Sequence, residues 1–316
     1  MIETTQVEGF EALRLSSEEG LTATFLPGAG MLGVSLRDGE QELLGQRHGL
    51  ATYLRDARTM ALPLLHPWAN RLSRDAFEVA GQQVRIADGA AGLHRDGNGL
   101  PMHGLLAGRP EWIVERDGTA GGEAADAGGA AFGATFDYGA HPELLASFPF
   151  PHMLRIEVAL HARTLRLTTT LTATGDVPVP VAYGFHPYLR LPDTPRERWQ
   201  VELPALRHLQ LDARSIPTGA AEQEPASVHL LGDRAFDDAY DGVEPGTRFA
   251  VGDGTRRIEL RFEQGFAAAQ VFAPLSEPVV CFEPMTAPTD ALVSGNGLRL
   301  VEPGERDVSA FSLTVA

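Results

Sequence analysis

The sequence feature that most constrains the fold is a strict alternation of apolar and mostly polar residues near the middle of the chain. Apolar residues occupy every second position from 154 to 160, and the alternation resumes from 165 to 171 after a break at 161–164. A period of two places the apolar side chains on one face of a strand. These residues therefore predict an antiparallel hairpin with one buried face.

Shorter runs of the same kind recur along the chain, with Asp-Gly, Gly-Gly or Pro-containing turns between them. They lie at 83–87, 112–115, 199–203, 257–262, 269–272, 279–282, 298–301 and 309–315. Only 40–48 and 51–60 could each hold a helical turn or two, and strands do not alternate with helices as in a parallel fold. We predict an all-β protein, a large antiparallel β-sandwich, with a single domain over residues 1–316.

The segment 117–131 is rich in glycine and alanine, which make up 11 of its 15 residues. Such a composition is typical of a flexible connection. A domain linker is one interpretation and a long hairpin extension is the other. We favour the extension, because strand-like patterns continue on both sides.

The charged residues exclude several classes of protein. All 26 basic residues are arginine, and the net charge is −16. Without lysine there is no Schiff-base enzyme, no pyridoxal-phosphate enzyme and no GxxxxGK[ST] phosphate loop. The acidity argues against a nucleic-acid partner, because phosphate contacts need a basic surface. A neutral small molecule is the more natural ligand.

Other sequence signatures are missing as well. The single cysteine, Cys281, excludes an intrachain disulfide and a CxxC metal site, and no HExxH, GxSxG or GxGxxG motif occurs. We therefore expect no metal and no dinucleotide cofactor. The N-terminal residues do not resemble a signal peptide, and no apolar run reaches the ~18 residues that span a membrane. The expectation is a soluble cytoplasmic protein with no membrane partner.

Four segments place chemically versatile residues among apolar neighbours. They read Leu-His-Pro-Trp-Ala-Asn-Arg-Leu at 65–72, Leu-Pro-Met-His-Gly at 100–104, Tyr-Gly-Phe-His-Pro-Tyr-Leu at 183–189 and Cys-Phe-Glu-Pro-Met at 281–285.

The carboxyl group of Glu283 follows an apolar β-type run. In a regular strand it shares a face with Cys281 and Val279. Burial there would raise the pKa of the carboxyl group from about 4.3 toward neutrality, where it can act as a base. The alternative is a strand-end glutamate that faces solvent because Pro284 stops the ladder.

The other polar residues have similar alternatives. His186 lies between an aromatic residue and a proline, and suits either proton transfer or a hydrogen-bonded place in the core. His103 precedes Gly104, at which the backbone can approach a ligand, although a histidine in a simple turn has the same pattern. Asn70 and Arg71 offer an amide and a guanidinium that can bind hydroxyl groups.

Taken together, the motifs Asn-Arg, His-Gly, Gly-x-His-Pro-Tyr and Phe-Glu-Pro resemble those of the aldose 1-epimerase (galactose mutarotase) family. They occur in the same order, in a β-rich chain of similar length, and the resemblance runs from about residue 21 to the C-terminus. The resemblance implies a β-sandwich that binds a hexose in an open cleft. It also implies interconversion of the α and β anomers of that sugar without a cofactor.

The resemblance also implies a role for each motif residue. Glu283 corresponds to the general base that takes the proton from the anomeric hydroxyl. His186 corresponds to the general acid that protonates the ring oxygen, so that the ring opens and can close on the other face. His103 corresponds to a second histidine that binds near the ring oxygen.

The remaining matches concern sugar binding. Asn70 and Arg71 resemble the pair that holds sugar hydroxyls. The Phe-Asp-Asp-Ala-Tyr segment resembles one that carries a sugar-binding aspartate, for which Asp237 is the better match and Asp238 the alternative. Gln270 weakly resembles a hydroxyl-binding glutamine.

Departures from the family pattern leave the sugar open. The Asn-Arg pair is preceded by His-Pro-Trp-Ala rather than Gly-Arg-x-x, and Pro-Met-Thr rather than Thr-Gln follows the glutamate. One alternative is a hexose-6-phosphate 1-epimerase, with Arg74 and Arg109 as candidate phosphate ligands. A glycoside hydrolase using Glu283 and Asp237 is another. The third is a non-catalytic carbohydrate-binding protein. A monomer and a homodimer are both compatible with the sequence.

Overall fold

The computed structural model describes residues 1–115 and 129–316, and every ladder between its strands is antiparallel. The N-terminal strands form a five-stranded sheet in the order β1 (Ile2–Val7), β2 (Phe10–Ser16), β3 (Leu21–Leu26), β4 (Leu32–Asp38) and β5 (Gln41–Glu42). A short 3-10 helix, η1 (Pro27–Ala29), joins β3 to β4.

A nine-stranded sheet contains the predicted hairpin. Its order is β11 (Ile113–Glu115), β12 (Ala130–Asp137), β13 (His152–His161), β14 (Thr164–Ala173), β28 (Arg306–Val315), β24 (Arg257–Gln264), β23 (Arg248–Gly252), β18 (Gln200–Leu203) and β21 (Ser227–Leu230). The hairpin over 154–171 is confirmed as β13 and β14, which pair from His152↔Ala173 to His161↔Thr164. The hairpin extension expected over 117–131 lies outside the described residues, except for its last three positions.

An eight-stranded sheet carries most of the candidate site. Its order is β20 (Pro217–Glu224), β19 (Leu206–Leu211), β22 (Phe236–Asp241), β25 (Ala268–Ala273), β26 (Val280–Met285), β16 (Gly184–Phe185) and β6 (Leu64–Leu65), and β17 (Tyr188–Leu189) also pairs with β26. Three two-stranded ladders complete the strands: β7 (Ala76–Val79) with β8 (Gln82–Arg85), β9 (His94–Arg95) with β10 (Pro101–Met102), and β15 (Val179–Val181) with β27 (Arg299–Val301).

The helices are short. They are α1 (Leu50–Asp56), α3 (Pro142–Leu145) and α4 (Ala291–Ser294), with 3-10 turns η2 (Tyr138–Ala140) and η3 (Arg196–Arg198). The helical turn expected within 51–60 is found as α1. The helical turn expected within 40–48 does not form, so that prediction is wrong. The Glu42 carboxylate there accepts hydrogen bonds from the N–H groups of Leu36 and Leu44, at 3.0 Å each. These bonds hold the segment extended beside β4.

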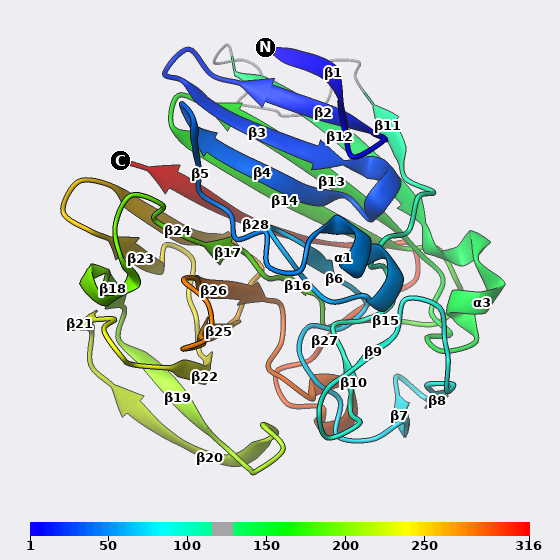
Figure 1. Cartoon of the computed structure of the whole chain (residues 1–316). Helices are drawn as coiled ribbons and strands as arrows, with labels where there is room; N and C mark the ends of the chain where they lie inside the picture. The colour runs from blue at the N-terminus through cyan, green and yellow to red at the C-terminus, as the bar shows by residue number, and fades with distance from the viewer. Residues whose placement is uncertain (116–128) are drawn as a thin grey trace.

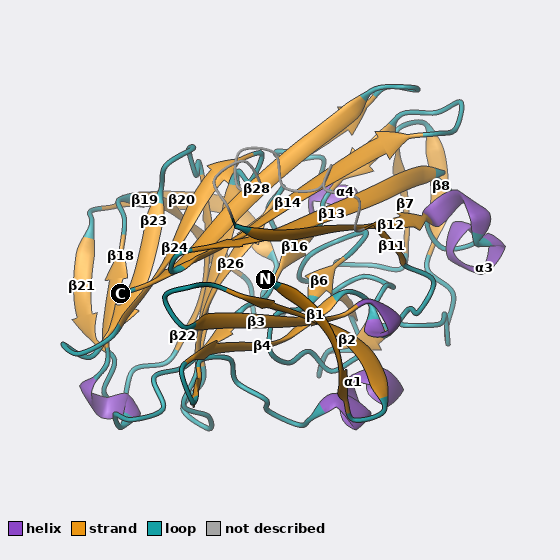
Figure 2. Ribbon diagram, turned by 90° about the horizontal axis from the view of Figure 1, so that it is seen from above, coloured by secondary structure: helices purple, strands orange, loops and turns teal. Residues whose placement is uncertain are grey.

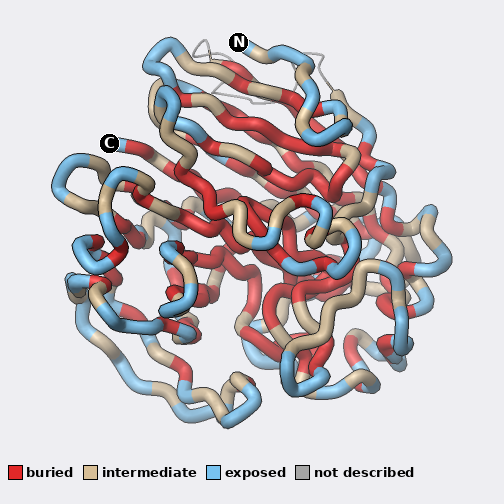
Figure 3. The backbone as a smooth tube through the Cα atoms, in the orientation of Figure 1, coloured by how far each residue is buried: buried red, intermediate tan, exposed pale blue. Residues whose placement is uncertain are grey.

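The five-stranded sheet packs on the nine-stranded sheet as a separate layer, as Figures 1 and 2 show. The ring of Phe25 in β3 meets that of Phe132 in β12, with centroids 5.9 Å apart. Burial is concentrated along the strands between the layers, and exposed residues lie mainly in the connections (Figure 3). The fold is thus the mostly β, antiparallel sandwich that the alternation predicts. None of the helices in the described part of the chain has the length and apolarity to cross a membrane.

Candidate active site

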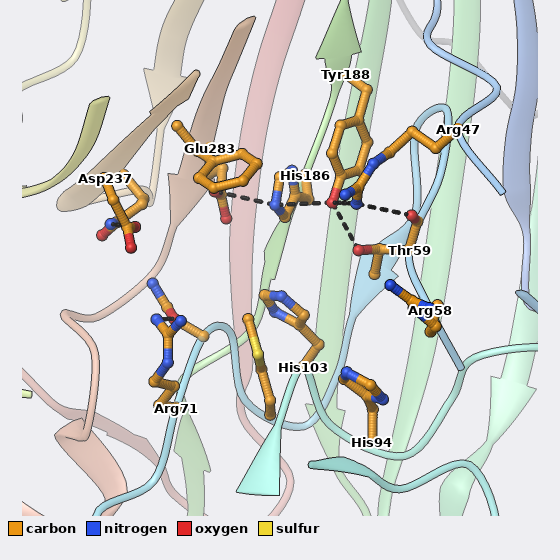
Figure 4. A pocket seen from close by; sticks show the side chains of 14 residues that line it. Arg47, Arg58, Thr59, Arg71, His94, His103, His186, Tyr188, Asp237 and Glu283 are labelled. Carbon is orange, nitrogen blue, oxygen red and sulfur yellow. Dashed lines mark hydrogen bonds and ion pairs between the residues drawn. The ribbon is translucent and has the colours of Figure 1, made fainter. Parts of the chain in front are cut away.

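A pocket of about 190 Å³ lies on one face of the eight-stranded sheet. It contains all seven site residues predicted from the sequence (Figure 4). Its walls are formed by Arg47, Arg58, Thr59, Asn70, Arg71, His94, Met102, His103, His186, Tyr188, Asp237, Gln270, Phe272 and Glu283.

The strand register explains why three of these residues share a face. Gln270 in β25 lies opposite Glu283 in β26 and opposite Ala239 in β22. Asp237 is two residues from Ala239, so its side chain points to the same side of the sheet. Asp238 points to the other side, where one of its oxygens lies 3.6 Å from Nε2 of His208. The geometry therefore places Asp237 and not Asp238 at the pocket.

The Glu283 side chain is 2% exposed, and β26 continues through Pro284 to Met285. The alternative of a solvent-facing glutamate at the end of a strand is wrong. Burial raises the pKa of the Glu283 carboxyl group well above its usual range, and the nearby charge of Asp237 adds to the effect. A carboxyl group in this state can exchange a proton near neutral pH.

His186 is held directly beside Glu283. β16 pairs with β26 at Gly184↔Met285 and β17 pairs with it at Tyr188↔Cys281, so His186 comes opposite Glu283. The approach is close enough to require glycine, since a Cβ at Gly184 would lie 2.6 Å from the carbonyl oxygen of Pro284. His186 Nε2 lies 3.2 Å from Glu283 Oε1.

Burial lowers the pKa of His186 well below its usual value, and His103 contributes in the same direction. The charged forms of Glu283 and His186 are thus both disfavoured by desolvation. At 3.2 Å the two groups titrate as a coupled pair. Such a pair can share a single proton, so one member can act as an acid while the other acts as a base.

His103 forms the opposite wall of the pocket from an unusual backbone. It has a φ of +63°, and its N–H donates to the carbonyl oxygen of Asn70, which has a φ of +56°. The next residue, Gly104, packs against the backbone of His66, where a Cβ would lie 2.1 Å from the carbonyl oxygen. The His103 and His186 rings meet edge to face at 5.5 Å. Burial lowers the pKa of His103 to about 3, so its imidazole is neutral.

The residues predicted to bind hydroxyls are already oriented. Arg71 Nε donates to Asp96 Oδ2 at 2.8 Å, and Arg71 Nη1 donates to Asn70 Oδ1 at 2.9 Å. Gln270 Nε2 donates to Asp237 Oδ1 at 2.7 Å. These bonds fix the side chains before any ligand arrives, which lowers the entropy cost of binding.

Several buried polar atoms in the pocket have no hydrogen-bond partner within the described residues. They are His103 Nδ1, His186 Nδ1, Gln270 Oε1 and Glu283 Oε2. Buried polar atoms are nearly always satisfied in folded proteins. Their concentration here is typical of a site that binds a polar ligand.

Sequence reasoning missed five polar residues in the pocket: Arg47, Arg58, Thr59, His94 and Tyr188. Tyr188 lies two residues after His186 in a recognised motif, so the period of two could have revealed it. The two arginines carry no local signal in a chain so rich in arginine.

The prediction that Arg74 and Arg109 could bind a phosphate in the pocket is wrong, because neither residue lines it. Arg109 instead forms ion pairs with Glu111 and Glu143, at 2.8 and 2.7 Å.

One group in the described part of the chain has metal-ligand chemistry. Ligand atoms of His208, Glu222 and Glu224 lie within 4.8 Å of one another on β19 and β20. The group is not part of the pocket, and His208 Nδ1 already lies 2.7 Å from a Glu224 oxygen. It therefore contributes no group to the site described above.

The fold is that of the galactose mutarotase-like antiparallel β-sandwiches. The model of the family described as Aldose 1-epimerase matches residues 11–314, and the chain belongs to that family.

Known proteins resemble the chain at low sequence identity. The uncharacterized protein YihR of Escherichia coli K12 is 23% identical over 260 residues, which are 77% of each chain. A galactose mutarotase-like protein from Clostridium acetobutylicum superposes with a TM-score of 0.82 at 16% identity, over 100% of this chain and 98% of the other. A putative aldose 1-epimerase from Escherichia coli K12 gives 0.72 at 18%, over 96% and 98%.

Proposed function

We propose that the protein is an aldose 1-epimerase that interconverts the α and β anomers of a hexose. The observation that carries the proposal is the buried contact of 3.2 Å between His186 Nε2 and Glu283 Oε1 inside the pocket. Mutarotation needs one acid and one base at the anomeric centre, and this pair provides both. The role of Asn70, Arg71 and Asp237 would be to hold the sugar hydroxyls.

In the proposed reaction Glu283 takes the proton of the anomeric hydroxyl. The C1 carbonyl forms, the bond between C1 and the ring oxygen breaks, and the ring oxygen takes a proton from His186. Rotation about C1–C2 and the reverse steps give the other anomer and restore both groups. Arg71 and Arg47 lower the pKa of Glu283, which favours the carboxylate that this direction requires. The neutral His103 would lie near the ring oxygen.

Polarimetry of freshly dissolved α-D-glucose and α-D-galactose tests the proposal. We expect the wild type to accelerate mutarotation, and Glu283→Gln to lose about 100-fold or more of the rate, since general acid–base catalysis contributes about 10²–10⁴-fold. Circular dichroism of the variant controls for folding. A wild type no faster than the uncatalysed reaction on a panel of aldoses would contradict the proposal, and sugar binding without turnover would favour the carbohydrate-binding alternative.

The hydrolase alternative loses support from the same geometry. It would be favoured if His186 lay outside the pocket while Glu283 and Asp237 faced each other. His186 instead lines the pocket beside Glu283.

A phosphorylated hexose is the second candidate substrate, because of the positive charge at one end of the pocket. Arg58 lies there, and its side chain makes no hydrogen bond or ion pair with any described residue. A second cavity of about 710 Å³ shares Arg47 and Arg58 with the pocket and is also lined by His48 and Arg190. The charge of Arg47 is compensated by Glu277, so Arg58 and Arg190 are the cations available for an anionic group.

Rates on glucose and glucose 6-phosphate separate the two candidates. If the phosphate reaches Arg58, the ratio of kcat/KM for glucose 6-phosphate over glucose exceeds one and falls about tenfold or more in Arg58→Gln, because a charge-assisted hydrogen bond contributes about 1.5–3 kcal/mol. Arg74→Gln, outside the pocket, is the matched control and should leave the ratio unchanged. A ratio below one that Arg58→Gln does not alter supports a neutral hexose.

A further inference from the structure

The hydroxyl of Tyr188 lies at the centre of a buried hydrogen-bond network behind His186 (Figure 4). Tyr188 Oη lies 3.1 Å from His186 Nε2, 2.6 Å from Thr59 Oγ1 and 2.8 Å from Arg47 Nη1. The tyrosine and histidine rings stack with centroids 4.1 Å apart and planes at 11°. Stacking of the tyrosine ring and the hydrogen bonds of its oxygen therefore hold the hydroxyl against the imidazole.

The donors in this network can be counted. Arg47 is always a donor, and Glu277 holds its guanidinium through two bonds of 2.9 Å. The hydrogen that Arg47 Nη1 donates occupies one lone pair of the Tyr188 oxygen. The hydroxyl has one proton to donate and one lone pair left to accept with. Thr59 and His186 must share these two positions, so when one donates to Tyr188 the other accepts from it.

Two arrangements of hydrogens satisfy this count. When His186 carries a proton on Nε2, Tyr188 Oη and Glu283 Oε1 share that proton as acceptors at 3.1 and 3.2 Å, and Tyr188 donates to Thr59. When Nε2 has lost its proton, Thr59 donates to Tyr188, and Tyr188 donates to Nε2. Apart from the Nε2–H bond of His186, the arrangements differ only in the rotation of two O–H groups, and both hydroxyl partners are buried.

We propose that Tyr188 and Thr59 are positioning residues that act as a reversible hydrogen-bond partner of His186, accepting from its protonated form and donating to its unprotonated form. This inference rests on the acid role proposed for His186. We assign that role to Nε2, which lies 3.2 Å from Glu283 Oε1 and would lose and regain a proton in every cycle. A partner of fixed polarity would stabilise one form and slow the other half of the reaction, whereas the hydroxyl pair serves both.

The Thr59 side chain offers the sharpest variants, because valine has the same shape without the hydroxyl. In Thr59→Val, the Tyr188 hydroxyl can still donate its hydrogen to unprotonated Nε2 of His186. When Nε2 is protonated, that hydrogen has lost Thr59 as its acceptor. We expect the pKa of His186 to fall and kcat to drop about tenfold, with KM nearly unchanged, as one net hydrogen bond corresponds to about tenfold or less. Thr59→Ser retains the hydroxyl and should restore the wild-type rate and pH profile.

Tyrosine variants provide the structural control. Tyr188→Phe removes the partner altogether, so we expect about a tenfold loss of kcat and a change in the tautomer of His186. Tyr183→Phe removes an equally buried hydroxyl, whose oxygen lies 2.6 Å from Ser309 Oγ and which does not line the pocket. It should leave both the rate and the tautomer unchanged.

The decisive readout is ¹⁵N NMR of the histidine side chains, titrated with pH in each full-length variant and assigned by comparison with His186→Gln. The proposal requires the His186 nitrogen signals to change in Thr59→Val and Tyr188→Phe but not in Thr59→Ser or Tyr183→Phe. It is overturned if the signals and the pH profile of Thr59→Val match the wild type, or if Thr59→Ser fails to restore them. These titrations need no turnover, so they remain informative if the wild type lacks mutarotase activity.

Discussion

Asp237 and Asp238 are neighbours in the chain, but their side chains enter different environments. Asp237 faces the pocket and accepts a hydrogen bond of 2.7 Å from Gln270. Asp238 lies on the other face beside His208, and burial raises the pKa of its carboxyl group. The alternation of a single strand thus separates a carboxylate that faces the pocket from one that lies on the other face of the sheet.

Replacement of each aspartate by asparagine should give distinct results. In the proposed function Asp237 accepts a charged hydrogen bond from a sugar hydroxyl, which contributes about 1.5–3 kcal/mol, so we expect Asp237→Asn to raise KM about tenfold or more. Asp238→Asn should leave KM near the wild-type value. Steady-state mutarotation kinetics measure both, and an increase in KM for Asp238→Asn alone would reverse the placement of the two residues.

At the scale of elements, the contact between β16 and β26 positions His186 beside Glu283. Gly184 lies against Pro284 and Ala69, and a Cβ at position 184 would approach the Pro284 oxygen to 2.6 Å and the Ala69 Cβ to 3.0 Å. Both contacts involve atoms that cannot rotate away. The two strands would have to separate to admit a larger residue, and the separation would carry His186 away from Glu283.

Gly184→Ala should therefore reduce stability and activity together. Overpacking of a buried site costs about 1–3 kcal/mol, and we expect a lower Tm with a loss of mutarotation. Gly97→Ala is the matched control, because no atom lies within 4 Å of a Cβ at that position. Thermal unfolding and polarimetry of both variants check the prediction. An unchanged Tm and rate in Gly184→Ala would show that the strands tolerate the methyl group.

Local sequence patterns predict some of the strands and fail for others. The hairpin β13–β14 is predicted closely, because its two strands are adjacent in the chain and alternate cleanly. The continuation of β26 past Pro284 is not, since proline usually ends a ladder. Residues 40–48 also mislead, because the bonds that hold them extended come from the carboxylate of Glu42.

At the scale of the whole molecule, strands distant in sequence are brought together. β28 at the C-terminal end pairs with β14 on one side and with β24 on the other. No local pattern specifies these partners, because every strand with a buried face has the same period of two. The pocket depends on the same assembly, since its walls come from segments between positions 47 and 283.

The sequence by itself determined the all-β class through its alternating patterns, and it identified the seven residues that meet in the pocket through motifs that resemble those of a known family. The tertiary structure decided the burial of Glu283, the choice between Asp237 and Asp238, and the convergence of Arg47, Thr59 and Tyr188 behind His186. Burial and hydrogen-bond partnership are properties of distances between remote segments. Those distances are fixed only when the sheets pack, and the proton chemistry of the pocket follows from them.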